Sequence, residues 1–236
     1  MTVAPPASRR PVAPRCKEKS VSDGEVEQLI KSKGRVKKHG EVFTPARMVD
    51  EMLDLVDDKL AEVDATFLEP AAGDGNFLIR ILQRKLAYIE RTAKPVDWQL
   101  ESLHALASIY AVELLPDNHA DAQANMLDVF AAWQSAHGTQ LSERHNLYRA
   151  AQFLIETNIV CGDFLTGQKS DGTGEFEFSW WRRTEPGCHK VRREAFTLNS
   201  LRRRAQTEQD MLDLFATGPT VYAPSLIDEV HKQVAR

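Results

Sequence analysis

The residues best suited to binding a ligand lie in one short stretch, residues 67–78. Glu69-Pro70 follow an apolar run, Gly73 and Gly75 come next, and an apolar-periodic segment opens at Phe77. This order predicts a buried strand, a sharp turn and a helix. Two glycines let the backbone pass close under a ligand in conformations that a Cβ would block, and a helix N-terminus offers free N–H groups. The stretch therefore predicts a small-molecule site at the end of a strand.

The residue types in this stretch also bear on the kind of ligand. Dinucleotide-binding enzymes place G-x-G-x-x-G at the same point, but Leu78 stands at the third glycine position. The Glu69 carboxylate suits a cationic amine or a sulfonium better than a pyrophosphate. S-adenosylmethionine therefore fits better than NAD. An ordinary turn that binds nothing is the alternative, since most glycine turns only connect elements.

A second polar feature precedes the glycine stretch. Thr44 is expected to cap a helix over residues 46–56, with Pro45 at the first helical position. Thr44 is either a simple cap, or its hydroxyl and the helix N-terminus meet the carboxylate of a ligand held by the glycine loop. The basic run over residues 31–40, which includes Lys37 and Lys38, is either a solvated surface or a group of cations that neutralises phosphates.

These two motifs together resemble a known family. Val42-Phe43-Thr44-Pro45, followed by residues 68–78, is similar to the opening of the adenine-specific DNA methyltransferases of type I and related type II restriction–modification systems. In that family the Thr-Pro helix lies under the methionine part of the cofactor, and the glycine loop wraps it. The resemblance implies a Rossmann-like S-adenosylmethionine methyltransferase fold. It implies that the cofactor is held by Phe43, Thr44, Glu69, Pro70, Ala71, Gly73, Gly75, Phe77, Glu113, Leu114, Asp163 and Phe164.

Two further acidic residues occupy places that bind the cofactor in that family. Residues 106–113 supply an apolar strand ending in Glu113, which would accept the ribose hydroxyls while Leu114 lies against the adenine. A third strand ends in Asp163, which would accept from the adenine amine, with Phe164 packed on the ring. Alternatively, Glu113 is a plain surface acid and Asp163 a turn former after Gly162.

The resemblance stops before the catalytic signature of the family. That signature is Asn, Asp or Ser, then Pro-Pro, then an aromatic residue, and it occurs nowhere in this chain. Residues 175–181 and 190–198 instead predict a basic β-hairpin. Ser179 and Trp181 are weak catalytic candidates, as acceptor for a target amine and as stacking ring.

The hairpin has two other interpretations. The catalytic contacts are lost or rearranged, and Arg182, Arg183, Arg192 and Arg193 bind phosphates or a protein partner. Alternatively, these arginines form a solvated charged face.

Length and composition set the domain organisation. The chain has 236 residues, 42% of them hydrophobic, and a formal charge of −4, which suits one sizeable core. We expect a disordered leader over residues 1–20, an α/β methyltransferase-like domain with a mainly parallel sheet over 21–216, and a helical tail over 217–236. The segment after the hairpin is too short for a complete seven-stranded sheet and a target-recognition domain, so a truncated sheet is expected.

Compartment and partners can be inferred from the remaining features. Cys16, Cys161 and Cys188 have no metal-ligand spacing, which indicates a reducing compartment and no metal site. No run reaches the length of a membrane span and no secretory signal is evident, so we expect a cytoplasmic protein. Any reading of DNA sequence would come from a specificity or partner subunit.

The leading hypothesis is an S-adenosylmethionine-dependent DNA (adenine-N6) methyltransferase-like protein, as a phage, plasmid or restriction–modification component. The first alternative is an inactive relative that acts as a cofactor-, nucleic-acid- or partner-binding module. The second is a methyltransferase for another substrate.

Overall fold

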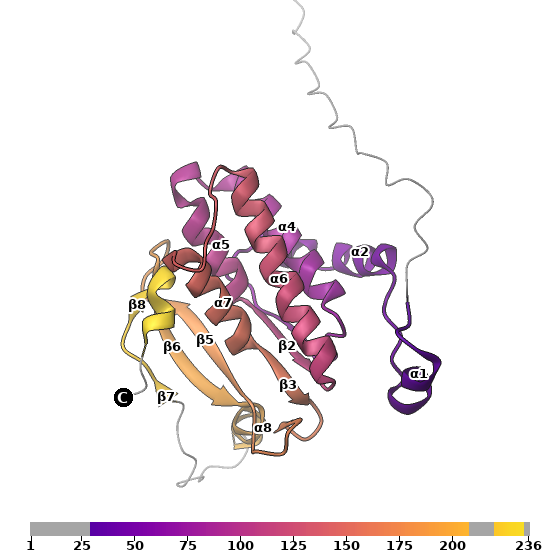
Figure 1. Ribbon diagram of the computed structural model, residues 1–236. Helices are drawn as coiled ribbons and strands as arrows, with labels where there is room; N and C mark the ends of the chain where they lie inside the picture. The colour runs from indigo at the N-terminus through magenta and orange to yellow at the C-terminus, as the bar shows by residue number, and fades with distance from the viewer. Residues whose placement is uncertain (1–28, 208–219, 234–236) are drawn as a thin grey trace, which may run out of the picture.

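The computed structural model describes residues 29–207 and 220–233 (Figure 1). The leader over residues 1–20, Cys16 and both ends of the tail expected over residues 217–236 lie outside these ranges. In chain order the elements are α1 (Lys33–His39), α2 (Ala46–Asp54), α3 (Asp57–Leu60), β1 (Phe67–Glu69), α4 (Asn76–Thr92), the 3-10 helix η1 (Pro95–Asp97), α5 (Trp98–Ala107), β2 (Ile109–Glu113), α6 (Pro116–Ala136), α7 (Asn146–Asn158), β3 (Ile159–Asp163), β4 (Gln168–Lys169), β5 (Glu177–Arg183), β6 (Lys190–Thr197), α8 (Leu198–Thr207), β7 (Thr220–Val221), β8 (Ser225–Leu226) and the 3-10 helix η2 (Ile227–Lys232).

The first sheet is mainly parallel, with the strand order β1-β2-β3-β4. β1 pairs parallel with β2 and β2 pairs parallel with β3, whereas the short β4 runs antiparallel to β3. Glu69, Glu113 and Asp163 are the last residues of the three parallel strands. The mixed α/β architecture with a mostly parallel sheet is compatible with the predicted Rossmann-like fold.

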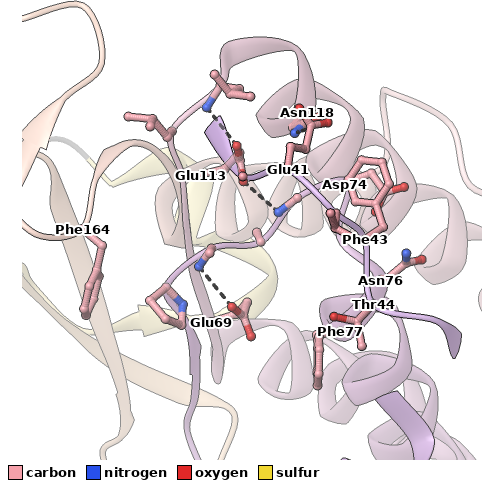
Figure 2. A pocket seen from close by; sticks show the side chains of 18 of the residues that line it. Glu41, Phe43, Thr44, Glu69, Asp74, Asn76, Phe77, Glu113, Asn118 and Phe164 are labelled. Atoms are coloured by element: carbon pink, nitrogen blue, oxygen red, sulfur yellow. Dashed lines mark hydrogen bonds between the residues drawn. The ribbon is translucent and has the colours of Figure 1, made fainter. Parts of the chain in front are cut away.

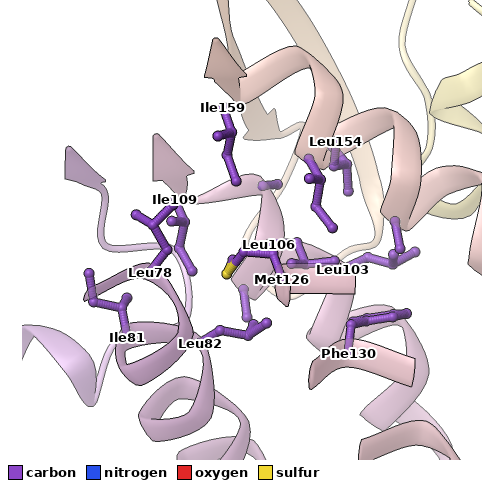
Figure 3. Packing of buried hydrophobic residues seen from close by; sticks show 14 of the residues in the cluster. Leu78, Ile81, Leu82, Leu103, Leu106, Ile109, Met126, Phe130, Leu154 and Ile159 are labelled. Carbon is purple, nitrogen blue, oxygen red and sulfur yellow. The ribbon is translucent and has the colours of Figure 1, made fainter. Parts of the chain in front are cut away.

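Helices α4 to α7 cover one face of this sheet. Ile109 of β2 and Ile159 of β3 are each 1% exposed and pack among side chains of these helices, including Leu82 and Leu154 (Figure 3). Side chains alternate along a strand, so Tyr110 and Val112 point to the opposite face. Each fully buried Leu or Ile contributes roughly 1.5–3 kcal/mol. This core fixes where the strands end.

The predicted hairpin covers the opposite face. β5 and β6 pair antiparallel, and Phe178 and Phe196 form a second core with Tyr110 and Val112. A Cβ at Gly162 would lie 2.5 Å from the Phe176 ring, so β3 needs a glycine where the hairpin crosses it.

The described C-terminal residues pack against the same body. β7 and β8 pair with β6, and Ile227 and Val230 of η2 are fully buried in the main core. Figure 1 draws η2 in yellow beside α7. Within the described part of the tail expected over residues 217–236, the helix is a short 3-10 helix, preceded by strands that the sequence did not predict.

A buried lysine ties the start of β1 to α4. Lys85 is fully buried, and its Nζ donates to the carbonyl oxygens of Glu62, Val63 and Ala65 at 3.1, 2.8 and 2.7 Å. The same ammonium lies 5.1 Å from the centre of the Phe67 ring. Burial lowers the pKa of Lys85 to about 7. The side chain holds the loop that leads into β1.

Two expected elements differ in detail. α2 begins at Ala46 with Pro45 in the cap position and no side-chain cap bond, so the prediction of Thr44 as cap is wrong. Of its apolar residues only Val49 and Leu53 are buried, whereas Met48 and Met52 are 47% and 50% exposed. The expected strand over residues 106–113 is shorter, because α5 continues to Ala107.

Metal-ligand clusters and membrane spans are absent from residues 29–207 and 220–233. These ranges contain no group of three or more His, Cys, Asp or Glu side chains placed to hold a metal ion. None of their helices combines the length and apolar character needed to cross a bilayer.

Candidate functional site

The carboxyl ends of the three parallel strands open into one cavity of about 660 Å³. Glu69, Glu113 and Asp163 all line it, as convergence of parallel strand ends requires. Figure 2 shows Glu69 and Glu113 at the cavity. Ligand pockets usually measure about 300–1,000 Å³. The cavity is therefore large enough for a nucleoside-sized ligand.

The predicted cofactor residues fall together at this cavity, with one exception. The lining includes Phe43, Thr44, Glu69, Pro70, Ala71, Gly73, Phe77, Glu113, Leu114, Asp163 and Phe164. Gly75 is not among the lining residues. Its φ is +95°, and an added Cβ would lie 3.2 Å from the Ala122 Cα of α6. Gly75 thus allows α4 and α6 to approach, which nothing in the local sequence could indicate.

Glu113 holds the glycine loop through hydrogen bonds to its backbone. Its side chain accepts from the Gly73 N–H at 2.7 Å and from the Leu115 N–H at 2.9 Å, one bond to each carboxylate oxygen. The residue is only 6% exposed. These bonds fix the loop backbone beside the cavity, and each oxygen keeps a lone pair for a further donor.

Gly73 is needed for conformation and for space. Its φ is +57°, a left-handed value that side chains rarely adopt. A Cβ there would lie 3.1 Å from the Phe43 ring. Phe43 is 8% exposed, so the ring has little room to retreat. Residues 40–44 therefore form the wall of the cavity that faces the glycine loop.

The loop carboxylates are partly withdrawn from water. Glu69 accepts from the Ala71 N–H at 3.0 Å, and burial raises the pKa of its carboxyl group. Burial also raises the pKa of Asp74. Asp74 Oδ1 is buried and accepts no hydrogen bond from the part of the chain that the structure describes. Two carboxylates here would gain from a cationic or hydrogen-donating ligand.

The ionisable side chains that line the cavity are all acidic in the described ranges, although Arg35, which is not among them, pairs with Glu41. The lining side chains include five acidic ones and, over the described ranges, no lysine, arginine or histidine. The five are Glu41, Glu69, Asp74, Glu113 and Asp163. Such a lining favours a ligand with positive charge and disfavours phosphates.

A basic strap closes one side of the cavity. We use this name for residues 29–45, which include α1. Arg35 binds the Glu41 carboxylate and donates to Asp117 at 2.7 Å and to Asn118 at 3.3 Å. Lys31 Nζ lies 2.6 Å from Asp121. Part of the basic run is therefore paired with the start of α6, and sequence reasoning missed Glu41 and Asn118 as lining residues.

The remaining lysines of the strap face outward. Lys37 and Lys38 are exposed on α1 and form no ion pair with any residue in the described ranges. Both side chains are therefore accessible. Whether they neutralise phosphates or form a solvated surface, the two interpretations of the basic run, stays a prediction.

The weak catalytic candidates lie elsewhere. Neither Ser179 nor Trp181 lines the cavity. Ser179 is 1% exposed, and its Oγ accepts from Arg193 at 2.9 Å. Trp181 packs against Phe153 of α7 with a centroid distance of 6.1 Å. The hairpin places both away from the cavity, with Ser179 buried and Trp181 partly buried beside α7, and their catalytic role stays a prediction.

The hairpin arginines divide into two kinds. The Arg183 side chain is 10% exposed and pairs with Asp64 at 2.8 Å and Glu101 at 2.7 Å. Arg193 lies over three aromatic rings, those of Phe153, Trp181 and Tyr222. Both side chains already have partners within the chain, and the nucleic-acid role predicted for them stays a prediction.

Arg182 and Arg192 are exposed and directly opposite each other in the ladder. Like charges in such a pair destabilise a sheet. Arg182 lies 4.9 Å from the Trp180 ring, and neither arginine has an acidic partner in the described ranges. The pair is therefore free to bind an anion.

Comparison with known proteins points to one class, the methyltransferases. One relative is the type II methyltransferase M.PaeR7I of Pseudomonas aeruginosa, which is 30% identical over 183 residues. The match covers 75% of this chain but 28% of the relative, so the chain spans about a quarter of its length. No protein-family model matches the sequence, and no solved structure matches it significantly. By this similarity the chain belongs to a methyltransferase family.

Proposed function

We propose that this chain is the cofactor-binding part of an S-adenosylmethionine-dependent DNA adenine methyltransferase. The observation that carries the proposal is the cavity, whose lining has five acidic side chains and no basic one in the described ranges. The sulfonium and the ammonium of the cofactor are cations, whereas the pyrophosphate of a dinucleotide would be repelled. The similarity to M.PaeR7I supports the same class.

The residues present fit the cofactor. Glu113 and Asp163, at adjacent strand ends, would hold the ribose hydroxyls and the adenine amine, and Phe164 would pack on the ring. Glu69 and Asp74 would face the positive groups, with Thr44 near the carboxylate end. When bound, the cofactor supplies an electrophilic methyl group. The role of the chain is to orient it through the side chains that line the cavity.

DNA is the acceptor that the free cations favour. Lys37, Lys38, Arg182 and Arg192 are exposed and fit phosphate contacts, which fix a duplex without reading its sequence. Adenine specificity rests on the resemblance of residues 42–45 and 68–78 to the adenine-specific enzymes. We further propose a restriction–modification system, a phage or a plasmid as the setting, with a specificity or partner subunit.

A second function, binding without transfer, is favoured by one observation. The chain has no Asn/Asp/Ser-Pro-Pro-aromatic tetrad, and Ser179 and Trp181 lie outside the cavity. Such a chain would act as a cofactor- or partner-binding module.

Two assays separate these functions. Calorimetry with S-adenosylmethionine should give one site per chain, and tritiated methyl transfer to adenine-containing duplex DNA measures activity. Binding with transfer supports the enzyme, and binding without transfer supports the module. A chain that binds no S-adenosylmethionine contradicts the enzyme and the cofactor-binding module, and leaves the partner-binding module.

A further inference from the structure

The turn that follows β3 forms one wall of the cavity. Asp163, Phe164 and Leu165 all line it. In Figure 2, Phe164 and Phe43 lie at opposite sides of the pocket. Asp163 Oδ1 accepts from the Leu165 N–H at 2.8 Å, and its carbonyl accepts from the Gly167 N–H at 2.8 Å. These local bonds set the shape of the turn, but its orientation in the cavity also depends on contacts from other elements.

Helix α8 supplies such contacts. Arg202 donates from Nη2 to the Phe164 carbonyl and from Nη1 to the Leu165 carbonyl, both at 2.8 Å. Asn199 Nδ2 donates to the Thr166 carbonyl at 3.1 Å. Residues three apart are neighbours on a helix surface, so both side chains reach the turn together. One face of α8 therefore holds three successive carbonyl groups of the cavity wall.

The hairpin fixes α8 in this place. β6 ends at Thr197, and α8 begins at the next residue. Leu198 is 7% exposed in the second core, and Leu201 packs against the same core. The Ser200 N–H donates to Thr197 Oγ1 at 3.1 Å, which satisfies one of the free N–H groups of the first helical turn. The helix thus presents Arg202 from a packed base.

The Arg202 guanidinium is engaged with the turn in two ways. Its Cζ lies 5.8 Å from the centre of the Phe164 ring, within the range of a cation–π contact. In the described ranges its hydrogen bonds go to the two carbonyls and to Asn199 Oδ1, and none goes to a carboxylate. A guanidinium is a planar fork of donors, which suits two neighbouring acceptors.

We propose that Arg202 is a positioning residue for the adenine end of the cavity. It holds the backbone of Phe164 and Leu165 so that the Phe164 ring stands where it would pack on the adenine of S-adenosylmethionine. Arg202 does not line the cavity and therefore acts through Phe164. This role rests on the proposed function, because it concerns the same cavity and the same ligand.

The test compares two ligands by calorimetry. Adenosine shares the base and the ribose with S-adenosylmethionine and lacks the methionine part. Arg202→Met removes the donors and the charge, and should weaken both ligands by the same factor, roughly 2–10-fold, which is the scale of one stacked aromatic pair. The matched control, Arg144→Met, removes the same charge from an exposed loop outside the cavity lining and should change neither affinity.

A double-mutant cycle with Phe164→Leu distinguishes positioning from general support of the fold. Leucine stays apolar but lacks the flat ring. Because Arg202 acts through that ring, Arg202→Met should cost little further affinity once the ring is gone. If Arg202→Met does not fold, Arg202→Lys enters the same cycle. It keeps the charge but loses the fork, so the same pattern should appear with a smaller loss.

Three results overturn the role of Arg202 and leave the proposed function standing. These are an unchanged affinity for both ligands, an equal loss with and without the Phe164 ring, and a loss for S-adenosylmethionine that adenosine does not share. The last would assign the effect to the methionine end. An unaltered chain that binds neither ligand refutes the proposed function of the cavity, and the role of Arg202 with it.

Discussion

Glu113→Gln is the sharpest test of how the glycine loop is held. The carboxylate accepts from the Gly73 and Leu115 N–H groups at 2.7 and 2.9 Å, with 6% of the residue exposed. Glutamine keeps one acceptor oxygen, so one of these N–H groups would face an NH₂ group. The fold should persist, because the change preserves the shape of the side chain.

The expected magnitude comes from the lost bond. A hydrogen bond to a charged group contributes about 1.5–3 kcal/mol, and each 1.4 kcal/mol is a factor of ten in affinity. If the loop must be ordered to hold the ligand, S-adenosylmethionine should bind roughly 10–100-fold more weakly. Exchange of the Gly73 amide should also accelerate in the absence of any ligand.

The assay combines calorimetry with hydrogen exchange. Glu143→Gln, on an exposed loop, removes the same charge away from the cavity and should change neither measurement. An affinity within twofold of the unaltered chain, with Gly73 still protected, would refute the reasoning. Faster exchange with unchanged affinity would show that the ligand does not need the loop.

Three other substitutions have distinct expected results. Gly73→Val should abolish S-adenosylmethionine binding in calorimetry, whereas Gly138→Val, at φ +81° with no atom within 4 Å of its Cβ, carries the same backbone strain and should retain it. Arg35→Met should weaken cofactor binding and speed proteolysis between α1 and α2, because it frees the strap, whereas the 85% exposed Arg47→Met should do neither. Lys85 has a folded pKa of about 7, below its value of 10.5 in the unfolded chain. The unfolded state therefore binds more protons between these values, and the stability of the unaltered chain relative to Lys85→Met should rise with pH by up to about 1.4 kcal/mol per unit. Urea unfolding at pH 7, 8.5 and 10 measures this difference, and a flat difference contradicts it.

The strand ends of the site were predictable because their signals are local. Each carboxylate follows its own apolar run, and parallel pairing brings the three ends together. The hairpin was predictable for the same reason, since Phe176, Phe178 and Trp180 alternate before a Pro-Gly turn. The structure adds that all these segments belong to one packed body.

Other parts of the site depend on contacts distant in sequence. Glu41 and Asn118 reach the cavity through Arg35, which joins segments 82 and 83 residues apart. Asn118 is 1% exposed, although an asparagine is usually expected at a surface. A periodic sequence pattern cannot predict a buried polar residue whose hydrogen bond comes from an arginine far away in the sequence.

The hairpin arginines show the same limit. Composition alone makes Arg182, Arg183, Arg192 and Arg193 equivalent, but strand alternation separates them. Arg183 and Arg193 turn toward Asp64, Glu101 and aromatic rings, while their neighbours turn to solvent. Charge clusters predict that cations are present and not which of them remain free.

The acidic lining also bears on what happens after a methyl group leaves. Transfer turns the sulfonium into a neutral thioether, so the spent ligand has one positive charge fewer facing the same five carboxylates. The cavity would therefore bind S-adenosylmethionine more tightly than the demethylated product. Replacement of the by-product by fresh donor between turnovers would then be thermodynamically favourable.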